Sequence, residues 1–178
     1  MKGTKSSARY ALALIDLAVE QQKLEEVMSD MQLVAKTIEE NHDLELLMHS
    51  PIVKFDKKQE VLRLVFGPFV QEMTIKFMEL VCAKGREAML PYVVRAFIAI
   101  YKERKGIVTA DVTSAVALSD AQRKEVIAAL ASIGTTIDLI EHVDPSLLGG
   151  LSIKVGDQRV DASLRRKLNE LKYDIHNS

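Results

Sequence analysis

Apolar residues recur every three or four positions along the first hundred residues of the chain, which is the spacing of amphipathic helices. Breaks in the pattern, including Ser50-Pro51 and Gly67-Pro68, divide it into six stretches, because proline drives the preceding residue out of the helical region. The sixth stretch ends at the charged segment 102–106. The pattern therefore predicts six helices with short connections, which we expect to pack as a bundle.

Residue types at the predicted helix ends indicate several boundaries. Ser6 or Ser7 can cap the first helix, since a serine side chain accepts a hydrogen bond from the free N–H groups of a first turn. Asp56 with Gln59 three positions later resembles a capping box at the start of the fourth helix. Gly85 can adopt the left-handed conformation that ends many helices, so the fifth helix is predicted to stop there.

The first and fifth helices have more apolar surface than a single packing contact uses. The first leaves a narrow polar stripe at Asp16 and Glu20, and the fifth leaves one at Glu72, Lys76 and Glu79. One interpretation is that both are central helices, sealed by their neighbours. The other is a groove between them that receives an amphipathic helix of another chain. Both interpretations fit the pattern.

After Gly106 the pattern changes from the period of helices to that of strands. Residues 108–116 and 136–143 alternate between apolar and polar positions and contain many β-branched side chains. Between them, Ser119 and Gln122 form a capping-box pair at the start of a helix. The pattern predicts a small domain of mixed helix and strand.

The segment 144–171 combines a turn, two strands and a helix. Pro145 and Gly149-Gly150 predict the turn, because proline restricts one dihedral angle and glycine accepts positive φ. Residues 151–155 alternate as a strand, and Gly156-Asp157 turns the chain into a short return strand. The period then becomes helical, with apolar positions at Leu164, Leu168 and Leu171.

Together these patterns predict an α+β protein of two domains. Residues 1–105 form an N-terminal six-helix bundle, and residues 106–178 form a small C-terminal α+β domain. About seventy residues can bury only a thin core, so we expect the second domain to be the less stable of the two.

Composition and charge limit the classes of function. The chain has 178 residues, 48% of them hydrophobic, and a formal net charge of −1. Nucleic-acid-binding and anionic-membrane surfaces normally carry a basic excess, so neither is predicted. No apolar run approaches the roughly 20 residues of a membrane-spanning helix. Residues 1–14 lack a signal-peptide pattern, and we expect a protein made in the bacterial cytoplasm, with a processed organellar chain as the alternative.

Motifs for catalysis, cofactors and metals are missing from the sequence. Neither a GxxxxGK[ST] nor a GxGxxG loop occurs, and the four histidines are dispersed without metal-ligand spacing. Cys82 lies in an apolar helical run, where a buried and unreactive thiol is expected. The basic run Arg165-Arg166-Lys167 is interpreted as an exposed helix face. The sequence therefore predicts no catalytic, cofactor-binding or metal-binding residue.

A C-terminal set of residues occurs in an order and spacing typical of one family. The set comprises Asp144-Pro145, Leu147, Gly149-Gly150, Ile153, Val155, Gly156-Asp157, Asp161, Ser163, Leu164, Leu168 and Leu171. It resembles the C-terminal signature of the δ subunit of bacterial and chloroplast F-type ATP synthases, whose mitochondrial counterpart is the oligomycin-sensitivity-conferring protein. Softer similarities to this family occur at Arg9-Tyr10-Ala11, Ala13-Leu14, Ser50-Pro51, Phe77-Met78, Leu80-Val81 and Ala83-Lys84-Gly85-Arg86.

The resemblance implies a structural subunit that binds no cofactor and performs no covalent chemistry. In that family the N-terminal helix of an F1 α subunit docks against the first and fifth helices, and the C-terminal domain engages the C-terminal region of the b subunits. The implied role is to hold the α3β3 head to the peripheral stalk during rotary ATP synthesis coupled to proton transport. The chain would then lie at the cytoplasmic face of the bacterial membrane, attached indirectly through Fo.

The resemblance also implies which side chains form the α-subunit site. They come from the facing sides of the first and fifth helices. The expected contact residues are Tyr10, Ala11, Leu14, Ala18, Thr74, Phe77, Met78 and Val81.

Two other functions fit the residue pattern. The first is a cytosolic helical adaptor or regulator that binds an amphipathic partner helix and has no tie to ATP synthase. The second is a small enzyme whose site comes together only in three dimensions. Binding to F1 α and stalk b distinguishes the stator role from both.

Overall fold

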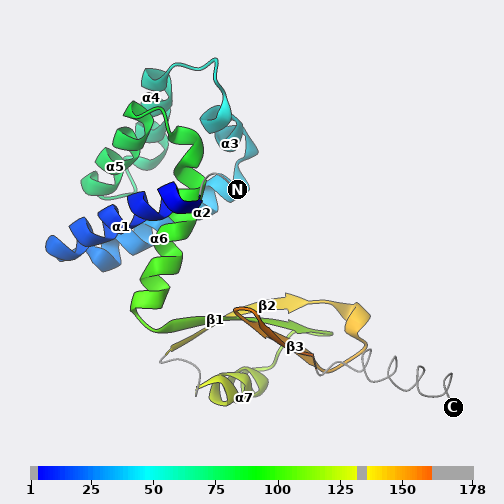
Figure 1. Ribbon diagram of the computed structural model, residues 1–178. Helices are drawn as coiled ribbons and strands as arrows, with labels where there is room; N and C mark the ends of the chain where they lie inside the picture. Colours follow the sequence, from blue (N-terminus) through cyan, green and yellow to red (C-terminus); the bar gives the residue numbers. More distant parts are fainter. Residues whose placement is uncertain (1–3, 132–135, 162–178) are drawn as a thin grey trace, which may run out of the picture. The chain divides into compact units, whose positions relative to one another are not determined.

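The computed structural model describes residues 4–131 and 136–161. The chain divides into two compact units, Met1–Tyr101 and Lys102–Ser178, which are described separately. The first unit is helical, and the second combines a sheet with one α-helix among its described residues (Figure 1). The α+β fold class predicted from the sequence is confirmed.

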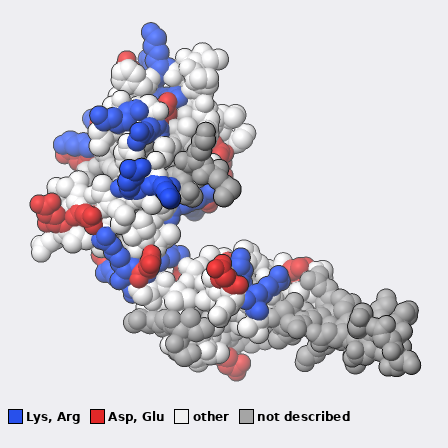
Figure 2. All heavy atoms as spheres, in the orientation of Figure 1, with Lys and Arg blue, Asp and Glu red and all other residues white. Residues whose placement is uncertain are grey.

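The helices of the first unit follow one another through short connections. They are α1 (Thr4–Glu20), α2 (Leu24–Glu40), α3 (His42–His49), α4 (Phe55–Phe66), α5 (Glu72–Ala83), the 3-10 turn η1 (Glu87–Met89) and α6 (Leu90–Arg104). Their apolar faces enclose a core that includes Leu14, Ile15, Met31, Phe66, Leu90 and Phe97. Charged side chains of both signs are scattered over the visible face of this unit, among many uncharged ones (Figure 2). The six predicted helices are therefore present.

Two of the predicted helix starts are wrong. α1 begins at Thr4, so Ser6 and Ser7 lie inside its first turns instead of capping it. α4 begins at Phe55 without a side-chain cap. The side chain of Gln59 instead donates a hydrogen bond of 2.8 Å to the backbone oxygen of Glu79 in α5, so a tertiary contact replaces the expected capping box.

A buried carboxylate holds the start of α5 against α2. Asp30 of α2 is buried, and its Oδ2 accepts hydrogen bonds from the backbone N–H of Gln71 at 2.8 Å and the hydroxyl of Thr74 at 2.6 Å. Because a charged acceptor satisfies donors at the beginning of the helix, the interaction also complements the positive end of the α5 dipole. Asp30 thereby fixes the position of α5 within the bundle.

Replacing Asp30 with alanine is expected to destabilise the helical unit by about 1–3 kcal/mol, since a buried hydroxyl loses its partner. Urea unfolding followed by circular dichroism measures the effect. The control is Asp43→Ala, which removes an exposed aspartate from α3. Equal unfolding midpoints for the two variants would contradict the role of Asp30.

The second unit contains a four-stranded sheet in the order β2-β1-β3-β4. Its described elements are β1 (Ile107–Ser114), α7 (Asp120–Leu130), β2 (Thr136–Val143), the 3-10 turn η2 (Pro145–Leu147), β3 (Leu151–Val155) and β4 (Gln158–Asp161). β1 pairs with β2 in parallel through the α7 crossover, whereas β3 pairs antiparallel with both β1 and β4. The predicted strands and the capping box of Ser119 with Gln122 are confirmed.

The core of this unit lies between α7 and one face of the sheet (Figure 1). Ala110 and Val112 of β1 are fully buried against Val126 and Leu130 of α7. Alternation places both β1 residues on the same face, since successive strand side chains point to opposite sides. Among the described residues of this unit, Leu147 has the largest fully buried side chain, with an exposure of 1%.

The turn predicted at residues 144–150 is present. The carboxylate of Asp144 accepts a hydrogen bond of 2.9 Å from the N–H of Ser146, and Leu147 is buried. Gly149 and Gly150 have φ values of 149° and 76°, which glycine adopts without the steric cost of a side chain. The helix predicted from the leucines at 164, 168 and 171 lies outside the described residues.

Candidate functional site: a groove between α1 and α5

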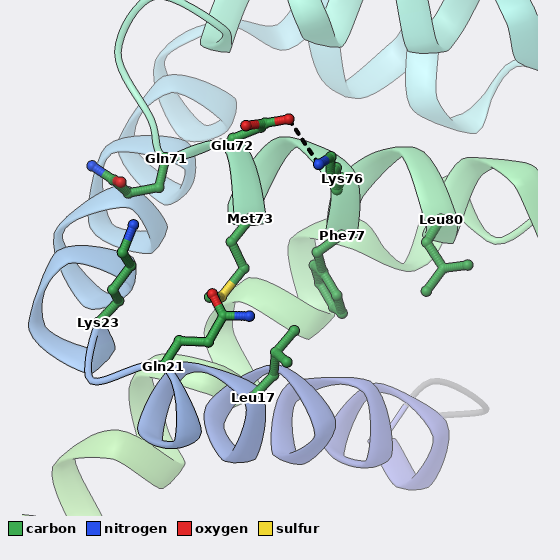
Figure 3. Close-up of a pocket in the computed structure, with 9 residues that line it drawn as sticks. All are labelled: Leu17, Gln21, Lys23, Gln71, Glu72, Met73, Lys76, Phe77 and Leu80. Atoms are coloured by element: carbon green, nitrogen blue, oxygen red, sulfur yellow. Dashed lines mark ion pairs between the residues drawn. The ribbon is translucent and has the colours of Figure 1, made fainter.

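A hollow of about 520 Å³ lies between the C-terminal half of α1 and the N-terminal half of α5. Figure 3 shows the side chains of the two helices pointing toward one another across it. The lining residues are Leu17, Gln21, Lys23, Gln71, Glu72, Met73, Lys76, Phe77 and Leu80.

The hollow has apolar walls and a polar edge. Leu17 is 40% exposed and Leu80 is 49% exposed, so both leave apolar surface open at the hollow. Phe77 and Met73 extend this apolar surface toward α1 (Figure 3). At the edge, Lys76 pairs with Glu72 at 2.7 Å. Such a surface favours binding of an apolar helix face with polar groups at its margin.

The groove follows a regular stripe on each helix. On α1 the groove-lining positions are Tyr10, Ala13 and Leu17, at spacings of three and four, and Gln21 follows four positions later, just after the helix ends. On α5 they include Met73, Phe77 and Leu80, at spacings of four and three. Since residues three or four apart share one helix face, each stripe is one continuous side of its helix.

A second hollow, of about 340 Å³, continues the groove toward the start of α1. Its lining residues are Ser6, Arg9, Tyr10, Ala13 and Arg86. The rings of Tyr10 and Phe77 meet edge to face at 6.5 Å between the two hollows. The groove therefore has an apolar part at one end and a basic part at the other.

The structure revises the predicted list of contact residues. Six of the eight side chains are 0% or 1% exposed and fill the core of the bundle, so they cannot contact a partner in this conformation. These six are Ala11, Leu14, Ala18, Thr74, Met78 and Val81. The hydroxyl of Thr74 is also committed to Asp30. Of the predicted set, only Tyr10 and Phe77 line the groove.

Several groove residues were not selected from the sequence. They are Arg9, Ala13, Leu17, Gln21, Met73, Lys76, Leu80 and Arg86. α1 is apolar on more than one side, so its periodicity alone does not distinguish the groove face from the core face. Leu17 shares an apolar set with Tyr10 in the sequence, which is the one signal that points to it.

Metal ligands and the single cysteine were the chemical groups considered in the sequence. None of their His, Cys, Asp and Glu side chains gather into a cluster of three or more that could hold a metal ion. Cys82 is fully buried, and burial, with a smaller contribution from Glu87, raises the pKa of its thiol to about 11. A protonated and inaccessible thiol is a poor nucleophile, so the predicted unreactive cysteine agrees with the structure.

Comparison with known families identifies the chain as a whole. Residues 7–175 match the family described as ATP synthase delta (OSCP) subunit. The chain belongs to this family. The resemblance noted in the sequence is thus confirmed, and the groove described above lies in a subunit of an ATP synthase.

Bacterial members of the delta family are similar over nearly their whole length. The ATP synthase subunit delta of Chlorobaculum tepidum is 36% identical over 176 residues, covering 98% of this chain and 97% of that protein. The ATP synthase subunit delta of Caulobacter vibrioides is 40% identical over 176 residues, covering 98% and 96% of the two chains.

A solved structure has the same fold as this delta-family chain. It is a chain of the Toxoplasma gondii mitochondrial ATP synthase hexamer, determined by cryo-EM. The TM-score is 0.73 at 28% sequence identity, and the match covers 95% of this chain and 96% of that chain. Within the described ranges, none of the helices is both long enough and apolar enough to cross a bilayer.

Proposed function

We propose that this chain is the stator subunit that joins the α3β3 head of F1 to the b subunits of the peripheral stalk. Family membership supports this role, and the groove between α1 and α5 is the structural observation that carries it. The chain holds the stator against the torque of the rotating centre while ATP is made, and it contributes attachment instead of catalysis.

In this proposal the N-terminal helix of an F1 α subunit occupies the groove. An amphipathic helix presents apolar side chains at positions i, i+3, i+4 and i+7, which fit between two antiparallel apolar stripes. Leu17 and Leu80 supply apolar surface that no residue of the described chain covers fully, whereas Phe77 is buried, with 8% of its surface exposed at the floor of the groove. Because apolar burial in such a contact slows dissociation, the groove suits a permanent attachment.

The predicted C-terminal domain, residues 106–178, contacts the C-terminal region of the b subunits in this proposal. Its described part carries exposed apolar side chains that a partner can cover: Val116, Ile127, Ile140, Val143, Leu148 and Val160. The N-terminal unit, residues 1–105, holds the head. Each attachment raises the effective concentration of the other, since both binding units belong to one chain.

Recovery of partners from membranes tests the proposal. The tagged full-length chain is used to isolate its complex from gently solubilised membranes at low ionic strength. Copurification of F1 α together with stalk b is expected. Recovery of soluble proteins without these subunits would favour an adaptor, and turnover of a substrate by the isolated chain would favour an enzyme.

A further inference from the structure

Two segments far apart in the sequence meet at the basic end of the groove. The first contains Arg9 and Tyr10 of α1, and the second contains Gly85 and Arg86, which follow α5. Nη1 of Arg86 donates a hydrogen bond of 2.9 Å to the hydroxyl oxygen of Tyr10, 76 positions away. The docking groove proposed above does not by itself explain why two arginines gather there.

The backbone at the end of α5 directs Arg86 toward Tyr10. The N–H of Gly85 donates to the carbonyl of Cys82 at 2.8 Å, and the N–H of Arg86 donates to the carbonyl of Val81 at 3.1 Å. These two bonds form a Schellman motif, which requires a left-handed residue. Gly85 supplies it with a φ of 64°. The reversal of the chain then returns Arg86 toward α1.

Tyr10 fixes the guanidinium of Arg86. The Cζ atom of Arg86 lies 5.6 Å from the centroid of the Tyr10 ring, a cation–π contact, in addition to the hydrogen bond to the hydroxyl. A guanidinium has five N–H donors in a planar fork. The Tyr10 hydroxyl accepts a hydrogen bond from Nη1 of Arg86. The other N–H groups of this oriented guanidinium remain available to a ligand in the groove.

The charges of Arg9 and Arg86 are not neutralised within the described part of the chain. Neither side chain forms an ion pair with a described carboxylate, and both are exposed. By contrast, Arg63, Arg95 and Arg123 pair with Glu79, Glu39 and Glu141. At the apolar end of the groove, Lys76 is likewise paired with Glu72. Lys23 also lines the apolar end, where its charge acts on the carboxylate of Glu72, so the two arginines are distinguished by meeting at a hollow whose lining contains no carboxylate.

We propose that Arg9 and Arg86 form a subsite for one acidic side chain of the docked helix. This inference rests on the proposed docking function and names the partner's chemistry. The partner carboxylate accepts from the free N–H groups of Arg86 and from Arg9, because arginine and carboxylate match in geometry as well as in charge. Tyr10 is a positioning residue, since it orients Arg86 without contacting the carboxylate.

The position of the subsite predicts the spacing in the partner helix. Tyr10 precedes Leu17 by two helical turns, which is roughly 10 Å along α1. A partner helix that lies along the groove therefore carries Asp or Glu about seven residues from the apolar anchor that contacts Leu17 and Leu80. The carboxylate thereby sets the register of the helix in the groove.

Binding measurements with the full-length chain test the subsite. The probe is a synthetic peptide of the F1 α N-terminal segment from the same organism, titrated by calorimetry. Arg86→Gln is expected to weaken binding about tenfold, and the Arg9→Gln/Arg86→Gln pair more, with a smaller dependence of affinity on salt. Arg86→Lys should recover part of the loss. The control Arg95→Gln removes an exposed arginine of α6 outside the groove and should bind normally.

The role of Tyr10 has its own measurement. Tyr10→Phe removes the hydroxyl that accepts from Arg86 and should weaken binding about threefold in the unsubstituted chain. The same change should have no effect when residue 86 is glutamine, and none when the peptide's acidic residue is replaced by its amide. A purely structural tyrosine would give the same loss in all three backgrounds.

The possible failures are distinguishable. If the peptide binds the unsubstituted chain and the double arginine variant with equal affinity and equal salt dependence, the acidic subsite is wrong and the apolar groove stands. If the peptide does not bind the unsubstituted chain, the docking proposal fails and the subsite fails with it. Circular dichroism of each variant checks that the helices are retained.

Discussion

Replacing Leu17 with glutamate is expected to weaken binding of the F1 α N-terminal peptide by about 100-fold or more while the bundle remains folded. Leu17 contributes to the apolar wall of the groove but is 40% exposed in the free chain. In the free chain the carboxylate therefore stays in water. Docking of a helix would bury it against apolar surface, which costs several kcal/mol when no partner compensates the charge.

Leu12→Glu is the matched control for this prediction. Leu12 lies on the same helix and has a similar exposure of 37%, yet it does not line either hollow of the groove. Its substitution should leave the affinity close to that of the unsubstituted chain. Equal losses for Leu12→Glu and Leu17→Glu would mean that the partner uses another face of α1. By contrast, Leu14→Glu should unfold the bundle, because Leu14 is a core residue.

Replacing Lys58 with alanine is expected to destabilise the helical unit by about 3–5 kcal/mol, the usual effect of leaving a buried charge without its partner. The side chain of Lys58 is 2% exposed, and that of Glu87 is 16% exposed. Nζ of Lys58 donates to Oε1 of Glu87 at 2.6 Å and to the backbone oxygen of Met48 at 3.1 Å. The lysine thereby connects α4 with α3 and η1 around one buried site.

The loss of Lys58 affects Glu87 most strongly. Oε2 of Glu87 is buried and has no hydrogen-bond partner among the described atoms, so Lys58 supplies most of its stabilisation. Urea unfolding measures the effect. Lys57→Ala is the control, because Lys57 is the preceding residue of α4 and forms an exposed pair with Glu60. Equal unfolding curves for Lys57→Ala and Lys58→Ala would show that the buried pair contributes nothing.

The buried pair also predicts how stability depends on pH. Burial is the largest single influence and raises the pKa of Glu87. The hydrogen bond from Lys58, a backbone hydrogen bond and the charge of Lys58 together outweigh burial, so this pKa lies below its ordinary value of 4.5. A lowered folded-state pKa stabilises the fold above the unfolded-state pKa, and this contribution is lost as pH falls through the folded-state value. The stability difference between the unsubstituted chain and Lys58→Ala should therefore shrink as the pH is lowered from 6 to 3.

The apolar groove shows why sequence periodicity points to two helices but does not separate their buried side chains from those that line the groove. The excess of apolar positions points to α1 and α5, and a hollow does lie between these two helices. In α1, however, Leu14 and Leu17 are both apolar and differ by only three positions. One is buried in the core and the other lines the groove. The difference depends on where α2, α5 and α6 lie, which no local pattern contains.

Local sequence determined the elements of this protein. Helical and strand periods, the capping box at Ser119, and the glycines at 85, 149 and 150 specify their structures through short-range sterics and hydrogen bonds. The signature residues of the C-terminal segment likewise identify the family from the chain alone.

Tertiary structure decided how those elements are used. It places Arg86 within hydrogen-bond distance of Tyr10 and places the carboxylate of Asp30 at the start of α5. The side chain of Gln59, which was expected to cap its own helix, donates a hydrogen bond to α5 instead. Each of these interactions joins residues at least 20 positions apart in the chain. Their partners become neighbours only when the bundle packs, and therefore the groove and its charge follow from packing and not from sequence period.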